Sequence, residues 1–135
     1  MGSGGEKGSD EEHAQLVREE IVRESDIVRS CLEALAIRGI FAHRNNTGAY
    51  TTEGGRYVAY GHPGSGDIIG ILPFVVRCGR TDRGVFLAIE CKTPKGRQSK
   101  KQRAYQRGIE KNQGVYLLVR SAKELSLEID RLQGG

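Results

Sequence analysis

Residues 88–92 read Ala-Ile-Glu-Cys-Lys, a strand-like run with an acid and a base two positions apart. Because side chains alternate along a β-strand, Glu90 and Lys92 would lie on the same face. The commonest explanation of such a pair is a surface ion pair at the end of an amphipathic strand. A second acid, Asp67, opens the apolar residues 68–72. Pairing of the two stretches would bring both carboxylates to one end of a sheet.

Two converging carboxylates repel each other, and proteins usually relieve the repulsion with a shared proton or a bound cation. Oxygen ligands beside a basic surface favour Mg²⁺ or Mn²⁺, which take a few carboxylates, a carbonyl and waters. The main-chain carbonyl of Cys91 would be an available ligand. Lys92 could orient or deprotonate an attacking water, or stabilise charge on a phosphate. These residue types therefore indicate metal-assisted cleavage of a phosphodiester.

The formal net charge of +4 conceals two segments of opposite sign. Residues 6–33 hold nine acids and four bases, whereas residues 92–111 hold eight bases and one acid, Glu110. A concentrated basic segment suits a polyanionic partner. A solvated helix face that binds nothing is the alternative, and charge alone does not separate the two.

Length and composition indicate one globular domain, with 135 residues of which 37% are apolar and 28% charged. We expect residues 1–10 to be a flexible leader and residues 11–135 a single domain. No apolar run reaches the ~20 residues of a membrane span and no signal peptide is recognisable, which predicts a cytoplasmic (intracellular) protein without a membrane partner. Cys31, Cys78 and Cys91 are widely spaced, which fits a reducing compartment rather than a disulfide framework.

Periodicity and turn residues predict an α/β fold in the order α-β-β-β-α-β-α. The expected helices span residues 11–38, 99–112 and a last segment opened by the capping box Ser121/Glu124; the first could be split by an internal N-cap at Ser25 and Asp26. The expected strands span residues 40–44, 67–76, 84–92 and 114–120, with a loop or irregular hairpin at 45–66 and a polar turn at 79–84. Residues 84–120 would form a parallel strand pair joined by a right-handed helical crossover, and hence a central mixed sheet flanked by helices.

Five motifs in a fixed order resemble those of the VRR-NUC (virus-type replication–repair nuclease) branch of the PD-(D/E)xK nuclease superfamily. They are Glu24-Ser25, Arg44-Asn45-Asn46-Thr47-Gly48, Gly64-Ser65-Gly66-Asp67-Ile68-Ile69-Gly70, Glu90-Cys91-Lys92 and Ser99-Lys100-Lys101-Gln102. The resemblance covers residues 21–125 and departs from the superfamily name at Gly66, which stands where proline precedes the aspartate. It implies a restriction-endonuclease-like core.

The resemblance also implies roles for single residues. Asp67 and Glu90 would bind Mg²⁺ or Mn²⁺ together with the Cys91 carbonyl, and Lys92 would assist the nucleophilic water. Glu24 would complete the site, as a ligand directly or through water, and Gln102 would steady Lys92 or the substrate. Simpler explanations stay open: Glu24 also suits a helix N-terminus, and Gln102 with Ser99 forms a capping box that competes for the same amide.

Eight further polar residues are candidates for contact with DNA phosphates. They are Arg44, Asn45, Asn46 and Ser65 near the expected site, and Lys95, Arg97, Lys100 and Lys101 beyond the catalytic strand. The first four could equally be turn residues. Phosphate contacts position a protein without reading sequence, which predicts little base specificity and a strong dependence on salt. Tyr50, Tyr57 and Tyr60 could stack on unpaired bases or pack across a hairpin.

The sequence thus predicts a metal-dependent DNA endonuclease that hydrolyses phosphodiesters, and the resemblance implies selectivity for Holliday junctions or other branched DNA. Two cuts across a four-way junction need two active sites, which predicts a homodimer. A non-catalytic nucleic-acid-binding module is one alternative. A nicking, flap or linear-duplex nuclease of the same superfamily is another, and it shares every motif.

Overall fold

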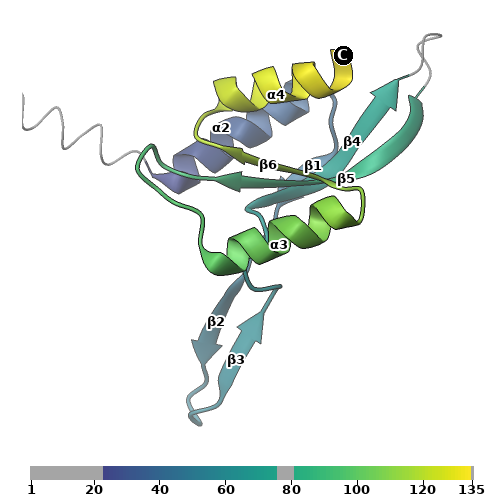
Figure 1. Cartoon of the computed structure of the whole chain (residues 1–135). Helices are drawn as coiled ribbons and strands as arrows, with labels where there is room; N and C mark the ends of the chain where they lie inside the picture. Colours follow the sequence, from purple (N-terminus) through teal and green to yellow (C-terminus); the bar gives the residue numbers. More distant parts are fainter. Residues whose placement is uncertain (1–22, 76–80, 135) are drawn as a thin grey trace, which may run out of the picture.

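The computed structural model describes residues 23–75 and 81–134. They form a mixed four-stranded sheet in the order β1-β4-β5-β6, with α2 and α4 on one face and α3 on the other (Figure 1). A separate two-stranded sheet, β2–β3, projects away from this core (Figure 1). The predicted α/β class, with a mixed sheet flanked by helices, is therefore confirmed.

The helices are α2 (Glu24–Ile37), α3 (Lys100–Lys111) and α4 (Ala122–Gly134). The main-sheet strands are β1 (Ala42–Arg44), β4 (Ile68–Val75), β5 (Thr81–Cys91) and β6 (Val115–Val119), and the hairpin strands are β2 (Gly48–Thr51) and β3 (Tyr57–Tyr60). Within the described ranges, no helix has the length and apolarity needed to cross a membrane.

The sheet topology places the ends of β4 and β5 side by side. β4 pairs antiparallel with β1 and β5, and β5 pairs in parallel with β6 across the crossover helix α3. The parallel pair expected for residues 84–120 is confirmed. Ile68 at the start of β4 lies opposite Ile89 near the end of β5, so the next pair outward is Asp67 and Glu90.

Alternation along the strands builds the core on the face that α2 and α4 cover. Ile68, Leu72, Leu87, Ile89 and Val119 are each fully buried there. Leu35 of α2 and Leu125 and Ile129 of α4 close the same core, as the spacing of apolar residues in those helices predicts. Burial of each large side chain contributes roughly 1.5–3 kcal/mol, so this layer holds the strand ends that carry the acids.

The ends of α2 follow from local chemistry, with one correction. Gly39 adopts φ +70°, and the N–H groups of Gly39 and Ile40 donate to carbonyls of the last turn, which confirms the expected glycine C-cap. The expected internal N-cap at Ser25 and Asp26 is wrong, because the helix already begins at Glu24. No side chain caps the helix there, and the acids of the first turn face its N-terminal dipole instead.

Two further expectations need correction. Residues 81–83, assigned to a polar turn, belong to β5, because its pairing with β4 continues as far as Thr81 opposite Val75 across a register shift. Residues 45–66, expected to form a loop or an irregular hairpin, contain a hairpin of regular register, which adds two strands to the predicted order. The rest of the turn, Cys78 and the part of the first expected helix before residue 23 lie outside the described residues.

Candidate active site

Strand pairing brings Asp67 and Glu90 together at the edge where β4 begins and β5 ends. The backbone N–H of Cys91 donates to Asp67 Oδ2 over 2.8 Å, which fixes this carboxylate against the end of β5. Gly66, just before it, lies so close to β5 that an added Cβ would stand 2.9 Å from the Ile89 carbonyl oxygen. Only glycine allows this approach without a shift, which gives a steric reason for its presence before the aspartate.

Glu90 is buried, with 2% of its surface exposed. Its Oε1 accepts a hydrogen bond of 2.8 Å from Gln102 Nε2, whereas its Oε2 is buried without a hydrogen-bond partner among the described residues. The interpretation of Glu90 as half of a surface ion pair is therefore wrong. A buried carboxylate oxygen that lacks a partner costs free energy and points to a ligand that would satisfy it.

Burial raises the pKa of Glu90 from its ordinary 4.5 to about 8. Repulsion by the neighbouring Asp67 is the second cause, and attraction by Lys92 acts in the opposite direction without cancelling it. The two acids thus disfavour each other's charge when no cation is bound. This is the electrostatic situation expected of paired carboxylates that share a proton or a positive ion.

Lys92 lies between two carboxylates. Its Nζ is 3.7 Å from Glu90 Oε1 and 3.8 Å from Glu24 Oε1, and only 11% of its side chain is exposed. Glu24 contributes from the N-terminus of α2 and is about half exposed. The structure thus brings together Glu24, Glu90 and Lys92, three of the residues to which the resemblance assigns roles in the site, from segments far apart in the sequence.

Gln102 caps its helix and also contacts the site, through Glu90 and not through Lys92 as the resemblance implies. Its Oε1 accepts from the Ser99 backbone N–H and its Nε2 donates to Glu90, each over 2.8 Å. The expected competition is wrong, because one amide carries an acceptor and a donor at separate atoms. The capping box thereby orients the glutamine that holds Glu90.

The donor set fits a hard cation that keeps most of its own waters. Asp67, Glu90 and the Cys91 carbonyl offer oxygen ligands, and Glu90 Oε2 has no other partner in the described chain. No group of three or more His, Cys, Asp or Glu side chains that could hold a metal occurs in residues 23–75 and 81–134. Mg²⁺ is commonly bound through one or two carboxylates plus water, whereas zinc needs a fuller protein shell.

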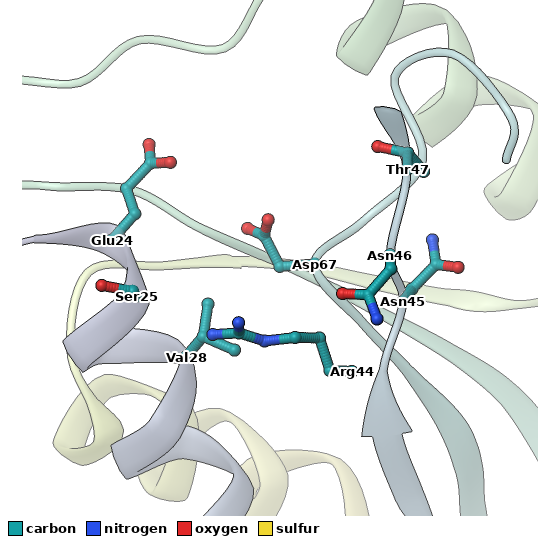
Figure 2. Close-up of a pocket in the computed structure, with 8 residues that line it drawn as sticks. All are labelled: Glu24, Ser25, Val28, Arg44, Asn45, Asn46, Thr47 and Asp67. Atoms are coloured by element: carbon teal, nitrogen blue, oxygen red, sulfur yellow. The ribbon is translucent and has the colours of Figure 1, made fainter. Parts of the chain in front are cut away.

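A cleft of about 250 Å³ opens beside Glu24 and Asp67 (Figure 2). Figure 2 shows Asp67 between Glu24 on one side and the segment 44–47 on the other, with the Arg44 side chain reaching toward Val28. Arg44 and Asn46 are exposed, so both are accessible from the cleft. Of the four candidates for DNA contact near the expected site, these two are the most accessible to a ligand in the cleft.

Asn45 and Ser65 are engaged with the protein itself. Asn45 Nδ2 donates to Ser65 Oγ and to the Gly66 carbonyl, each over 2.9 Å, and its backbone N–H donates to the Asp67 carbonyl over 2.8 Å. These bonds fasten the loop before β4 to the end of β1. They support the turn role for both residues, and their contact with DNA stays a prediction.

The predicted basic track lies next to this site rather than inside the cleft. Lys95 and Arg97 are exposed on the turn after β5, and Lys100 and Lys101 are exposed in the first turn of α3. Gln102 follows in the same turn, so this basic surface and the buried acid share one short segment.

Sequence reasoning missed Arg120. Its Nη1 donates to the carbonyls of Thr93 and Gly96, the latter over 2.8 Å, and so fixes the turn that immediately follows Lys92. Lys92 is tied to the same strand end through its own N–H, which donates to the Val119 carbonyl over 3.0 Å. An arginine directly after a buried strand was the available signal, but its partners lie more than twenty residues away.

Comparisons of the chain with protein-family models, curated protein sequences and solved structures give no match.

Proposed function

We propose that this protein is a Mg²⁺- or Mn²⁺-dependent DNA endonuclease of the VRR-NUC kind, built on a restriction-endonuclease-like core. The observation that carries the proposal is Glu90: a buried acid with an unpartnered oxygen, beside Asp67 and in contact with Lys92. A protein has little reason to bury this charge for stability, because a buried, poorly satisfied carboxylate destabilises the fold. Strongly shifted acids of this kind concentrate at functional sites.

Asp67, Glu90 and the Cys91 carbonyl would hold the cation. When bound, such a cation would neutralise charge developing on the phosphate and supply a water of increased acidity. Lys92 would hold a positive charge beside the attacking water or the phosphate, at a position kept by Glu24 and Glu90. Gln102 would keep Glu90 in the orientation that faces the cation. The resemblance implies products with 5′-phosphate and 3′-hydroxyl ends.

The basic surface around α3 supports a nucleic acid as the substrate. Lys100, Lys101, Arg103, Arg107 and Lys111 are all exposed on this helix. Such a surface attracts a phosphate backbone and makes binding depend strongly on salt. It has no function in an enzyme for small molecules. The free, buried thiols of Cys31 and Cys91 fit a reducing, intracellular setting.

We further propose a homodimer that acts on branched DNA, since paired cuts in a four-way junction need two sites. Ile71 of β4 lies opposite Phe86 of β5, and its N–H donates to the carbonyl of Phe41, the residue before β1. The three side chains are exposed, Phe41 to 71%, Ile71 to 50% and Phe86 to 44%. Large apolar side chains gathered on one sheet face are typical of protein contacts. Phe86→Glu is expected to halve the mass that light scattering measures for the wild-type protein.

The deciding experiment incubates labelled four-way junction, flap and linear duplex DNA with the protein in Mg²⁺, in Mn²⁺ and in EDTA. Lys92→Ala is the test variant. Lys123→Ala is its matched control, because Lys123 is an exposed lysine on α4, on the other side of the sheet.

Paired cuts near the junction that disappear in EDTA and in Lys92→Ala, but persist in Lys123→Ala, would support a junction-cutting nuclease. Cleavage mainly of flap or linear duplex under the same conditions would keep the nuclease and replace the branched substrate. Salt-sensitive binding without cleavage of any substrate would reject the nuclease and leave a binding module.

A further inference from the structure

A second groove, separate from the cleft at Glu24 and Asp67, runs between α3 and the loop before β4. Its volume is about 430 Å³, within the range of about 300–1,000 Å³ typical of ligand pockets. His62 and Pro63 form one wall, and Ala104, Tyr105 and Ile109 of α3 form the other. A mainly apolar lining with two aromatic side chains suits an aromatic ligand.

Tyr105, in the wall of the groove, contacts two other aromatic rings. The rings of His62 and Tyr105 are 5.6 Å apart between centroids, and Tyr105 also meets Tyr116 edge to face at 6.4 Å. Tyr116 is buried, and its hydroxyl accepts a hydrogen bond from Gln98. Tyr105 is therefore held from behind while it lines the groove, and a ligand could stack on it without first ordering it.

The groove has a cation at its edge, because the exposed Lys101 lines it. Arg107 and Lys111 are exposed farther along the same helix and do not line the groove. These three side chains form no ion pair within residues 23–75 and 81–134 that would neutralise them. A ligand that combines an aromatic ring with negative charge would satisfy both the groove and its rim.

The groove adjoins the candidate active site through two short connections. The loop that carries His62 ends at Asp67, and it packs on α3 so tightly that a Cβ on Gly64 would stand 2.4 Å from the Lys101 carbonyl oxygen. On the helix side, Lys101 at the groove edge precedes Gln102, which holds Glu90. A strand whose phosphate reaches Glu90 could thus place a neighbouring base at the groove.

We propose that this groove binds an unpaired nucleobase, stacked on Tyr105, of a strand whose phosphates follow the basic side chains of α3. The inference rests on the proposed function and names its substrate more closely: DNA with unpaired nucleotides beside the cut. A base inside an intact duplex cannot enter the groove, because it is already stacked and paired. Base stacking on an aromatic side chain tolerates any sequence, so the groove would recognise unpaired structure without reading bases.

Gly108 offers a way to close the groove without removing a contact. It lines the groove, and an added Cβ meets no other atom within 4 Å. Leucine at this position would fill the space, and it also favours a helix over glycine. Gly108→Ala is the matched control, because it gives the same helical benefit with little filling. Tyr105→Leu removes the stacking ring, and Tyr105→Phe is its control, because phenylalanine keeps an aromatic ring at the same position.

The test measures binding in EDTA by fluorescence anisotropy, with a labelled oligothymidine and a blunt duplex of equal length as probes. Full-length wild-type protein and the four variants are compared, since EDTA already prevents metal-dependent cleavage, and thermal unfolding checks that each protein is folded. Gly108→Leu and Tyr105→Leu are expected to weaken single-strand binding about 5- to 150-fold, which corresponds to the loss of one stacked base. Duplex binding should stay within about twofold, because the phosphate contacts remain.

The proposal would be overturned if Gly108→Leu and Tyr105→Leu bound both probes more weakly by the same factor, or if they bound the single strand as tightly as the unsubstituted protein. Failure of the wild-type protein to bind the single strand would overturn it too. Because no cleavage is needed, these outcomes are separate from the nuclease test: a protein that cuts DNA but binds single strands equally well with the groove filled keeps the nuclease and loses the base site.

Discussion

Replacement of Glu90 by glutamine is expected to stabilise the protein in the absence of divalent cations. The change removes a charge that is 2% exposed and has one unpartnered oxygen, while the shape of the side chain stays almost the same. The glutamine oxygen can still accept from Gln102, and its NH₂ group can donate toward Asp67. Because the substitution removes a buried charge and keeps the hydrogen bonds, it should favour the folded state.

The magnitude follows from the pKa of Glu90, which rises from 4.5 to about 8 on folding. At about 1.36 kcal/mol per pH unit, this shift lowers the free energy of unfolding above pH 8 by at most about 5 kcal/mol relative to its value at low pH. A carboxyl that binds its proton more tightly in the folded chain contributes its full stability below pH 4.5 and loses it as pH rises through about 8. Because the protein relaxes around the charge, we expect Glu90→Gln to be more stable than the wild type above pH 8 by about 2–3 kcal/mol, or roughly 6–12 °C in Tm.

Thermal unfolding in EDTA at pH 4, 6, 8 and 9 measures this effect, with Glu33→Gln on the exposed face of α2 as the control. The Tm of Glu90→Gln should equal that of the wild type at pH 4 and exceed it by a growing margin up to pH 8–9. The Tm of Glu33→Gln should show no such increase over the wild type. Added Mg²⁺ or Mn²⁺ at ten times its Kd should raise the wild-type stability by about 1.4 kcal/mol at pH 8 and the variant much less. If the variant were less stable than the wild type at pH 9, or if the difference did not depend on pH, the inference that the buried charge of Glu90 destabilises the fold would be refuted.

Three other substitutions test the elements that position the site. Arg120→Leu should cost about 1.5–3 kcal/mol by unfolding in urea and lower cleavage more than DNA binding, because it frees the turn after Lys92; unchanged cleavage would argue against this positioning role. Gly64→Ala should lower the stability by 2 kcal/mol or more in the same assay, as roughly the sum of a strained φ of +77° and a clash with the Lys101 carbonyl, and a neutral effect would show that the loop can shift. Gln102→Glu keeps the helix cap but meets a buried acid, so its Tm should fall relative to Gln102→Ala at pH 8 and not at pH 5; the same loss at both pH values would contradict this.

Local signals in the sequence were sufficient for most elements. The apolar alternation of residues 84–92 and 114–120, the Ser99/Gln102 capping box and the glycine at the end of α2 each act within a few residues along the chain. Their free energies are decided by neighbours in sequence, so pattern alone predicts them. The same kind of signal failed at the start of α2 and in residues 81–83, where pairing and packing with distant segments overrode local preference.

The chemistry of the site was decided by contacts between distant segments. The sequence by itself determined which acids, lysine and amide could serve, and strand alternation predicted that Glu90 and Lys92 share a face. Only the tertiary structure decided that Glu90 is buried with one free oxygen, that Glu24 reaches Lys92, and that Arg120 holds the turn beside it. Burial and charge depend on which strands become neighbours and which helix covers them, and no short-range pattern carries that information.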